Sequence, residues 1–209
     1  FQSIPQGYNQ QVSPGEQALR FYTDFANTTK KGYTWNNKMP NSLDAFTRGI
    51  AGFFFGYSYN IPTIEARAPK LNYSVVQIPQ LNIDVPVNFA NYWVETVAKK
   101  STHQNEAWDF LQFAAGAEQV QSYLKKTNKS SALRSVVATQ KDDPIIGPFA
   151  TQALTAKSWY KGRNAGAAEN AFLQMINQVT SETALNDPDA YRKSLEEAST
   201  RVGQTYVTQ

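Results

Sequence analysis

SLDAFTRGIAGFFFGYSYNIPTIEARAPKLNYSVVQIP, residues 42–79, is the most informative stretch of this chain. It opens with a short helical pattern that Ser42 can cap and Gly49 can end. Residues 51–55 follow as an apolar run with three successive phenylalanines. This run is too short for a buried helix and suits a strand that is covered on both faces. The first half of the stretch therefore predicts a helix, a glycine and a buried strand.

The second half of the stretch returns to polar sequence before it becomes extended again. Residues 56–60, GYSYN, predict a turn that keeps two aromatic rings, at Tyr57 and Tyr59. A brief helical pattern covers 63–68 and is broken by proline. Residues 72–78 then alternate in the manner of a second strand, which ends at Pro79.

Amphipathic helices are predicted on both sides of this stretch, because apolar residues recur there at helical spacing. The first begins at Ser13, Pro14 and Glu16, which together are typical of a capped helix start, and the last begins at a cap formed by Asp187 and Pro188. In the helix over 105–124, the apolar residues Ala107, Phe110, Leu111 and Ala114 should face inward. The predicted helices cover 14–26, 105–124, 144–156, 168–179 and 187–202. A third extended segment is predicted within 85–97, where apolar and polar residues alternate.

Composition excludes several classes of protein. The 209 residues are 41% hydrophobic and 18% charged, which is typical of a globular chain, and no apolar run approaches the roughly 18 to 20 residues that span a bilayer. The absence of cysteine excludes disulfides, thiolate catalysis and cysteine-bound metals. His103, the single histidine, starts a predicted helix and suits a capping or surface position better than catalysis. The net charge of +3 comes from dispersed basic residues, which favours a solvated surface over a nucleic-acid site.

Enzyme chemistry finds little support in the sequence. Neither of the glycine-rich sequences that bind nucleotide phosphates, G-x-G-x-x-G and G-x-x-x-x-G-K-[ST], occurs, so no nucleotide cofactor is predicted. Acidic pairs at 142–143, 187/189 and 196–197 could in principle serve a glycosidase. They lie in strongly polar surroundings, however, and helix neighbours do not face each other. We therefore expect a binding protein without catalytic residues, cofactor or metal.

The order of pieces within 42–79 resembles a block of a known family. The pieces are AFTRG at 45–49, the apolar run at 51–55, the aromatic turn at 56–59 and YSVVQIP at 73–79. They resemble the extracellular solute-binding proteins of ABC transporters, in particular the sugar-binding family that includes maltose-binding protein. NEAWDFLQFAAGAEQVQSYL, residues 105–124, is the most specific local match. ALRS, residues 132–135, is similar to another family motif but lacks its proline.

The resemblance implies an α/β fold of the periplasmic-binding-protein type (type II). The fold would be helix-rich, mostly the C-terminal lobe with part of the N-terminal lobe. Residues 1–77 and 131–209 would then belong to the C-terminal lobe, and 78–130 to the N-terminal lobe. Because the matching features belong to the later half of such proteins, we expect a fragment or matured piece that lacks the first half. Apolar surface should then be exposed around 51–55 and 85–89.

The implied function is capture of an extracellular or periplasmic solute, a sugar or oligosaccharide, for an ABC permease. The missing N-terminal half would be a partner, and a lipoprotein anchor through the absent N-terminus stays open. Two alternatives also stay open. One is a binding protein for a peptide, polyamine or glycerophosphodiester, and the other is an adhesion or sensory module outside transport. Nucleic acid is not an expected partner.

A sugar site needs aromatic platforms for CH-rich faces and polar groups for hydroxyls. The resemblance places Tyr59 foremost as the stacking ring, with Tyr57 second. It also implies that the segment with Asn91, Tyr92 and Trp93 lies near a cleft and supplies candidate contacts, although Trp93 could instead be buried beneath the adjacent helix. The turn at 157–164 is a further candidate, because it places the rings of Trp159 and Tyr160 beside cationic residues. The remaining candidate residues are Trp35 (which could instead pack under its loop), Trp159, Tyr160, Arg163 and Asn170.

Overall fold

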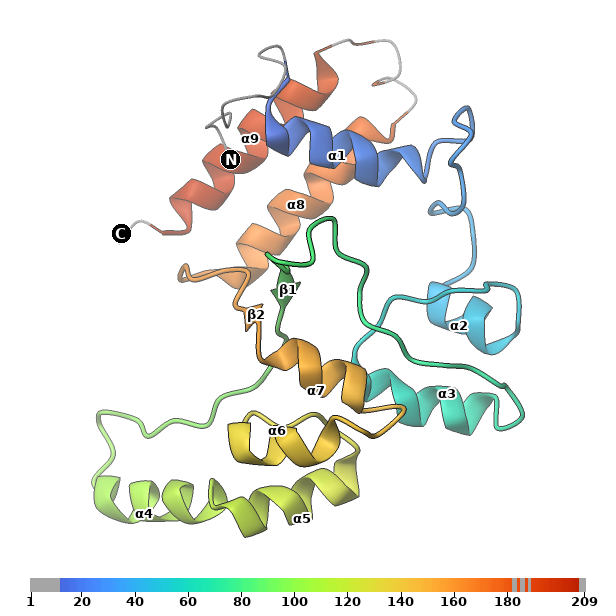
Figure 1. Ribbon diagram of the computed structural model, residues 1–209. Helices are drawn as coiled ribbons and strands as arrows, with labels where there is room; N and C mark the ends of the chain where they lie inside the picture. The colour runs from blue at the N-terminus through green and yellow to red at the C-terminus, as the bar shows by residue number, and fades with distance from the viewer. Residues whose placement is uncertain (1–11, 182–183, 185–186, 188, 207–209) are drawn as a thin grey trace. The chain divides into compact units, whose positions relative to one another are not determined.

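The computed structural model describes residues 12–181, 184, 187 and 189–206 (Figure 1). The chain divides into two units, which are described separately below. The first combines Phe1–Pro40 with Tyr160–Gln209, and the second is Asn41–Trp159. These divisions fall at other places than the predicted lobe boundaries, so the lobe assignment stays a prediction.

The described residues are mainly helical, with a few residues in strands. The first unit contains α1 (Pro14–Asp24), α8 (Ala165–Val179) and α9 (Ala190–Gln204). The second contains α2 (Ser42–Thr47), η1 (Ser58–Asn60), α3 (Ile61–Arg67), β1 (Asn88–Phe89), α4 (Gln104–Ala114), α5 (Ala117–Thr127), α6 (Arg134–Gln140), α7 (Gly147–Ala153) and β2 (Ala156–Lys157). A helix-rich α/β chain with few strands is therefore confirmed, whereas α6 and β2 were not predicted.

Helix α1 starts where the sequence predicts. The Glu16 N–H donates to Ser13 Oγ at 3.2 Å, and Pro14 occupies the first turn, where its missing N–H has no consequence. The Glu16 carboxylate accepts from the Arg20 guanidinium at 2.8 Å. The predicted cap of the last helix differs, because α9 begins at Ala190 after Asp189, and Pro188 lies outside the described residues.

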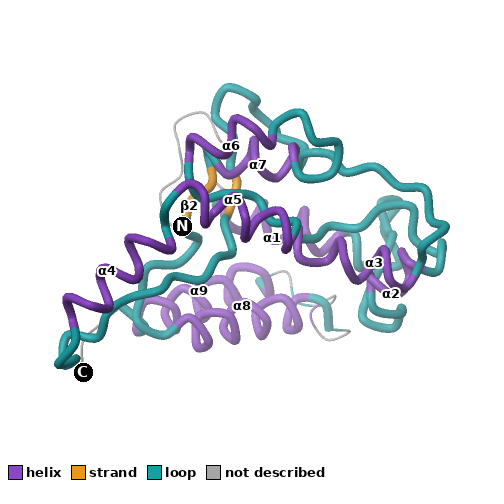
Figure 2. Tube along the Cα trace, turned by 90° about the horizontal axis from the view of Figure 1, so that it is seen from below, coloured by secondary structure: helices purple, strands orange, loops and turns teal. Residues whose placement is uncertain are grey.

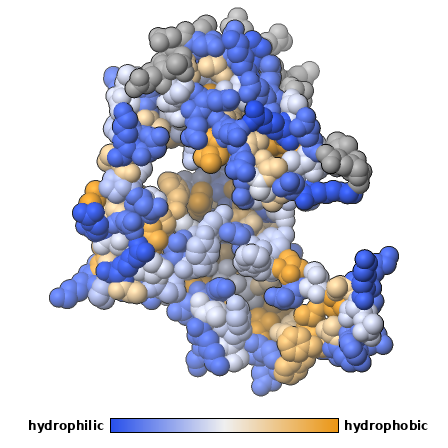
Figure 3. Space-filling view, turned by 180° about the vertical axis from the view of Figure 1, so that it is seen from behind, coloured by the Kyte–Doolittle hydropathy of each residue, from blue (hydrophilic) through white to orange (hydrophobic). Residues whose placement is uncertain are grey.

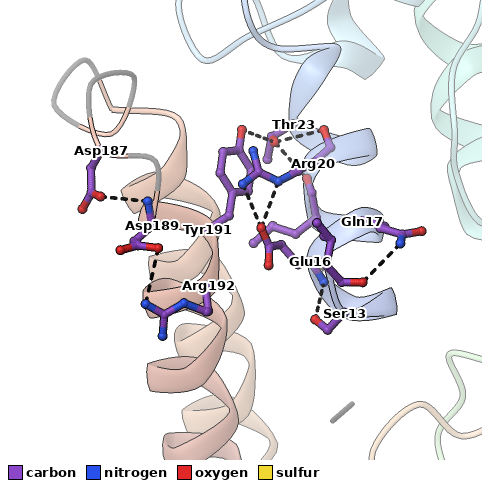
Figure 4. Close-up of polar contacts among 11 residues, drawn as sticks. Ser13, Glu16, Gln17, Arg20, Thr23, Asp187, Asp189, Tyr191 and Arg192 are labelled. Carbon is purple, nitrogen blue, oxygen red and sulfur yellow. Dashed lines mark hydrogen bonds and ion pairs between the residues drawn. The ribbon is translucent and has the colours of Figure 1, made fainter. Parts of the chain in front are cut away.

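The core of the first unit lies where α1, α8 and α9 meet. Figures 1 and 2 show α8 and α9 side by side, with α1 against them. Small and medium apolar side chains fill the contact: Leu19, Met175, Val179 and Ala198 are buried, and Phe172, Ile176, Tyr191 and Leu195 pack around them. These side chains recur at helical spacing along α8 and α9, so the amphipathic helices predicted over 168–179 and 187–202 are confirmed. Thr23 Oγ1 also lies 3.1 Å from the Tyr191 hydroxyl, which joins α1 to α9 by a polar contact (Figure 4).

Helix α2 is capped one residue earlier than predicted. Asn41, not Ser42, accepts the free N–H groups, from Leu43 at 3.0 Å and Asp44 at 3.4 Å. Asparagine is as good a cap as serine, so the sequence allowed both starts. Gly49 ends the helix as predicted, with φ of +72°, a conformation that suits glycine.

The two strands predicted at 51–55 and 72–78 are wrong, since neither segment forms a strand in the structure. A strand needs a neighbouring strand for its backbone N–H and C=O groups, and neither segment has one among the described residues. Phe54 packs its ring on Phe46, with ring centroids 5.9 Å apart, while Phe53 is 90% exposed and Phe55 76%. Val85, Val87 and Phe89 are exposed as well. The predicted apolar exposure around 51–55 and 85–89 is therefore confirmed.

The observed strands form a parallel pair. β1 lies within the predicted extended segment 85–97, and it pairs with β2 in the register Asn88 to Ala156 and Phe89 to Lys157. Parallel strands need a long crossover. Here residues 90–155, which include α4 to α7, supply it.

The single helix predicted over 105–124 is interrupted at Gly116, which has extended backbone and caps α5. The inward face predicted for its first part is also wrong, because no residue of α4 is buried. Its aromatic side chains Trp108, Phe110 and Phe113 are exposed. The lower right of Figure 3 shows hydrophobic surface over this part of the second unit. Within the described ranges, no helix is both long and apolar enough to cross a membrane.

Candidate functional site

Three of the predicted site residues converge at one edge of the parallel strand pair. Because the strands run in the same direction, the residues that follow each strand emerge at the same edge. Asn91 and Trp93 follow β1, and Trp159 follows β2. The Ala90 N–H donates to the Lys157 carbonyl at 3.1 Å, which carries the pairing past the end of β1. The backbone therefore places Asn91 and Trp159, each two residues past its strand, at the same edge, and Trp93 follows Asn91 two residues farther along the chain.

Side-chain hydroxyls fasten this edge. The Tyr92 hydroxyl and Ser158 Oγ lie 2.5 Å apart. This hydrogen bond joins the chain just after Asn91 to the chain just before Trp159. Trp93 is 95% exposed, which overturns the alternative in which it is buried beneath the adjacent helix. Asn91 and Trp159 are exposed as well. The edge thus presents rings and an amide to solvent, which is the chemistry of a polar ligand platform.

A second polar contact fastens the opposite end of the same strand pair. Asn88 Nδ2 donates to Thr155 Oγ1 at 2.9 Å, and Asn88 Oδ1 accepts from Gln80 Nε2 at 3.2 Å. Gln80 Oε1 in turn accepts the Val87 N–H at 2.8 Å. Two-residue strands offer few ladder hydrogen bonds, and these side-chain contacts add to them at this end of the pair.

The aromatic turn predicted at 56–60 forms a separate group in the same unit. The Tyr57 and Tyr59 rings stack, with centroids 5.4 Å apart and an interplanar angle of 23°. They are 44% and 55% exposed, respectively. Asn60 Oδ1 accepts the Tyr57 N–H at 3.0 Å, and this bond holds the turn. The structure therefore brings the two tyrosines together and leaves half of each ring open to solvent.

Gly56 allows this turn to close. A Cβ at this position would collide with the Phe54 ring and lie 2.9 Å from Asn60 Oδ1. Phe54 is in turn anchored on Phe46, which also meets the Tyr73 ring edge-on at 6.2 Å. Burial, and to a smaller extent the Glu65 carboxylate, raise the pKa of Tyr73. The glycine that precedes the stacked tyrosines thus lies beside a cluster of three rings, those of Phe54, Phe46 and Tyr73.

The remaining predicted residues lie in the first unit, on separate elements. The Tyr160 hydroxyl is 2.6 Å from Thr205 Oγ1 and accepts the Asn164 N–H at 2.9 Å, so it ties the chain before α8 to the end of α9. Gly162 leaves room for this hydroxyl, because a Cβ there would collide with it. Arg163 is exposed beside it, and its backbone N–H donates to the Thr205 carbonyl at 3.1 Å.

Trp35 and Asn170 have simpler surroundings. The half-buried Trp35 donates its indole N–H to the Pro40 carbonyl at 3.2 Å, so this polar group serves its own loop. Asn170 is exposed on α8. A shallow hollow on one face of α9 contains none of the predicted residues, since Lys193, Glu196, Glu197, Thr200, Arg201 and Gln204 line it. Among the described residues, no group of three or more His, Cys, Asp or Glu side chains could hold a metal.

Ser158 and Asn60 are the contacts that sequence reasoning missed. Asn60 could have been found, because an asparagine at the end of an aromatic turn commonly accepts a backbone N–H. Ser158 could not have been found, because its contact forms only where β2 pairs with β1. A strand of two residues leaves no recognisable pattern in the sequence. Each residue holds a tyrosine that was already a candidate contact: Asn60 accepts the backbone N–H of Tyr57, and Ser158 hydrogen-bonds to the Tyr92 hydroxyl.

The family of bacterial extracellular solute-binding proteins matches residues 5–148, more than half of the 209 residues. The chain belongs to this family. No individual curated protein matches it. Bacterial extracellular solute-binding proteins bind solutes outside the cytoplasm, so solute binding is the function that membership supports. The part of the resemblance that concerns the solute-binding family is thereby confirmed.

The matched range of this solute-binding protein contains both stretches that carried the resemblance, 42–79 and 105–124. It also contains the tyrosine stack and the residues that follow β1. Trp159, Tyr160, Arg163 and Asn170 lie beyond it. The family match therefore covers the stacked tyrosines, Asn91 and Trp93, and one of the two strands that form the edge.

Proposed function

We propose that this solute-binding protein captures a sugar or oligosaccharide and delivers it to an ABC permease. The observation that carries the proposal is the pair of stacked, half-exposed rings of Tyr57 and Tyr59. Sugar rings present flat CH-rich faces that pack on aromatic rings, while their hydroxyls need neutral donors and acceptors. The phenol hydroxyls and the nearby Asn60 amide are of that kind.

The proposed contact set centres on Tyr59, with Tyr57 beside it. Trp93, Asn91 and Trp159 form a second proposed group at the edge of the strand pair, where rings and an amide are exposed together. Trp35, Tyr160, Arg163 and Asn170 stay in the set on the resemblance alone. Their polar groups are partly used within the first unit, which makes them weaker candidates.

The proposed architecture is the type II periplasmic-binding-protein fold, shared between two lobes. Residues 1–77 and 131–209 would belong to the C-terminal lobe and 78–130 to the N-terminal lobe, and a first half of the protein would complete both. The exposed aromatic face of α4 and the unpaired segments at 51–55 and 72–78 support this view. Contiguous exposed apolar faces are normally covered in a stable protein, and extended segments without a partner strand are places where another chain can pair.

The proposed location follows from the function. A protein that collects solute for a permease works in the periplasm or at the outer surface of the cell. We propose that it is either a free periplasmic protein or a lipoprotein that is anchored to a membrane. Fractionation of cells that express the full gene, followed by globomycin treatment, separates the two, because only a lipoprotein accumulates as an unprocessed precursor.

A ligand screen on the full gene product tests the proposal. Maltose, maltotriose, cellobiose and sucrose represent neutral sugars, and spermidine, glycerophosphocholine and trialanine represent the alternative solutes. A tight ligand raises the unfolding temperature by mass action. We expect a shift with at least one sugar and none with the other three compounds. A shift with spermidine, glycerophosphocholine or trialanine alone, or with no compound, would contradict the sugar assignment.

Replacement of Tyr59 tests the site itself. With the sugar that gives the largest shift, Tyr59→Ala should weaken binding by about 1 to 3 kcal/mol, because an apolar face and a stacking contact are lost. Tyr59→Phe keeps the ring and should lose much less. Tyr22→Ala is the matched control, since Tyr22 is an exposed tyrosine on α1. Unchanged affinity for Tyr59→Ala by calorimetry would remove Tyr59 from the site.

A further inference from the structure

The strand pair is fastened by one side-chain hydrogen bond at each end, and the two bonds differ in what they hold. At the beginning of the pair, Asn88 and Thr155 join at 2.9 Å. At the carboxyl end, the Tyr92 hydroxyl and Ser158 Oγ join at 2.5 Å. The first bond links two short side chains next to the backbone. The second reaches out to the tip of an aromatic ring and fixes its orientation.

The Tyr92 ring needs such a contact to keep one orientation. It is exposed, as are Asn91 and Trp93 on either side of it. An exposed aromatic side chain changes rotamer readily, and ordering it on ligand binding costs free energy that weakens affinity. Ser158 is half-buried and directly follows β2, and a single side-chain torsion limits its Oγ to a few positions close to the backbone. A hydrogen bond to this short side chain therefore restricts the ring before solute arrives.

The hydroxyl pair also has the right chemistry for a neutral, hydroxylated solute. Each hydroxyl has one proton and two lone pairs. When one hydroxyl donates to the other, the acceptor keeps its own proton, and both oxygens keep lone pairs. The pair can thus donate to and accept from a solute hydroxyl at the same time. It offers no formal charge to an anion or a cation.

We propose that Ser158 is a positioning residue for solute binding, which holds the Tyr92 ring and hydroxyl at the carboxyl edge of the β1–β2 pair. Tyr92 is then the solute contact, and its chemistry selects a neutral, hydroxylated solute. This inference rests on the proposed function. It assigns a role to Ser158, which was not a candidate residue, and it gives the candidate Tyr92 an orientation and a hydrogen-bonding partner.

The test uses the full gene product and the sugar of the four-sugar panel that binds it most tightly. Ser158→Ala should raise Kd about 3- to 10-fold, which is the range for one net hydrogen bond. Ser158→Thr keeps the hydroxyl and should restore most of the affinity. Tyr92→Phe should weaken binding to a similar extent. The double variant should be little worse than either single one, because both remove the same contact.

Thr155→Val is the matched control, because it removes a hydrogen bond from the other end of the same strand pair. It should leave Kd within about twofold of the wild-type value. Equal weakening by Thr155→Val and Ser158→Ala would show that the strand register, and not the Tyr92 ring, is what matters. That result would overturn the inference.

The outcomes separate this inference from the proposed function. If the wild-type protein binds a sugar and Ser158→Ala binds it equally well, the positioning role is wrong and sugar capture stands. If Ser158→Ala weakens binding but Ser158→Thr does not restore it, the hydroxyl is not the cause and the positioning role is again wrong. If no sugar binds to the wild-type protein, both the sugar function and the inference fail.

Discussion

The guanidinium carbon of Arg20 lies 4.1 Å from the centre of the Tyr191 ring. The same guanidinium donates from Nε and Nη2 to Glu16 Oε1, at 3.1 Å and 2.8 Å. One arginine therefore ties α1, near the start of the chain, to α9, near its end, and also pairs a buried carboxylate. Figure 4 shows this arrangement beside the Thr23 contact to the Tyr191 hydroxyl.

Arg20→Met should destabilise the first unit. It keeps much of the apolar stem but removes the cation–π contact and leaves the Glu16 carboxylate, which is mostly buried, without its partner. An unpaired buried polar group costs about 1 to 3 kcal/mol, and the loss should appear as a lower free energy of unfolding in urea. Adding Glu16→Gln to Arg20→Met should recover part of the lost free energy of unfolding, because the unpaired negative charge of Glu16 is then removed.

The matched control is Arg192→Met on α9. Arg192 pairs with Asp189 at 3.4 Å and Glu196 at 3.2 Å, but all three side chains are exposed. Exposed pairs contribute about 0 to 1 kcal/mol. A loss for Arg192→Met as large as that for Arg20→Met would refute the importance of the Tyr191 and Glu16 contacts.

Met175→Ala should destabilise the same unit by about 2 to 5 kcal/mol, because it opens a cavity among Leu19, Val179 and Ala198. Leu173→Ala, two residues earlier on α8, removes a similar apolar volume from an exposed position and should cost well under half as much. Urea unfolding curves of both variants measure the difference. Similar losses would mean that α8 turns another face to the core.

Gly56→Ala should weaken the proposed sugar binding by the full gene product. The added Cβ must displace the Phe54 ring or the Asn60 amide, and either shift moves the Tyr57 backbone on which the stack depends. Gly52→Ala is the control, because a Cβ there meets no atom within 4 Å. Calorimetry should show a higher Kd for Gly56→Ala only; equal values for the two variants would argue against a role for the turn.

The pKa of Asp187 should be lower than that of an ordinary aspartate. A hydrogen bond from Lys193 is the main cause, and the Asp189 N–H and the nearby charges of Lys193 and Arg192 add to it. A carboxylate with a lowered pKa in the folded state stabilises that state above its unfolded pKa. This stabilisation is lost as pH falls through the folded pKa.

Carboxyl-detected NMR titration measures the Asp187 pKa directly. Lys193→Met should raise it toward the ordinary value, since the 3.0 Å contact from Nζ to Asp187 Oδ2 is removed. Arg201→Met, on the same helix, serves as the control for a change in net charge. An Asp187 pKa that is the same in the wild type and in Lys193→Met would contradict the assigned cause.

Most of the helices could be predicted because their information is local. Met175 and Val179 lie one helical turn apart, and Ser13 and Glu16 are three residues apart, so a short window of sequence contains each pattern. The strands predicted at 51–55 and 72–78 are wrong, because a strand also depends on a neighbour far away in sequence, which a local pattern does not contain. The short pair that does form joins Asn88 to Ala156, across 68 positions that no local pattern connects.

The candidate site also has one part that local sequence could indicate and another part that it could not. Tyr57 and Tyr59 lie within one turn, and the resemblance singled them out as a stacking platform, whose rings the structure leaves half-exposed. The bond from Tyr92 to Ser158 spans 66 positions and exists only because β1 and β2 pair. A local pattern could single out the tyrosine, but not the serine that holds it.

The open phenylalanines at 53 and 55 have a consequence for the life of the chain in a cell. Chaperones and proteases act on apolar, extended segments of the kind that unfolded chains present. While these two rings stay exposed, chaperones and proteases would bind the folded molecule as they bind an unfolded chain. The half-life of the chain in a cell therefore becomes a measure of how much of that segment something else covers.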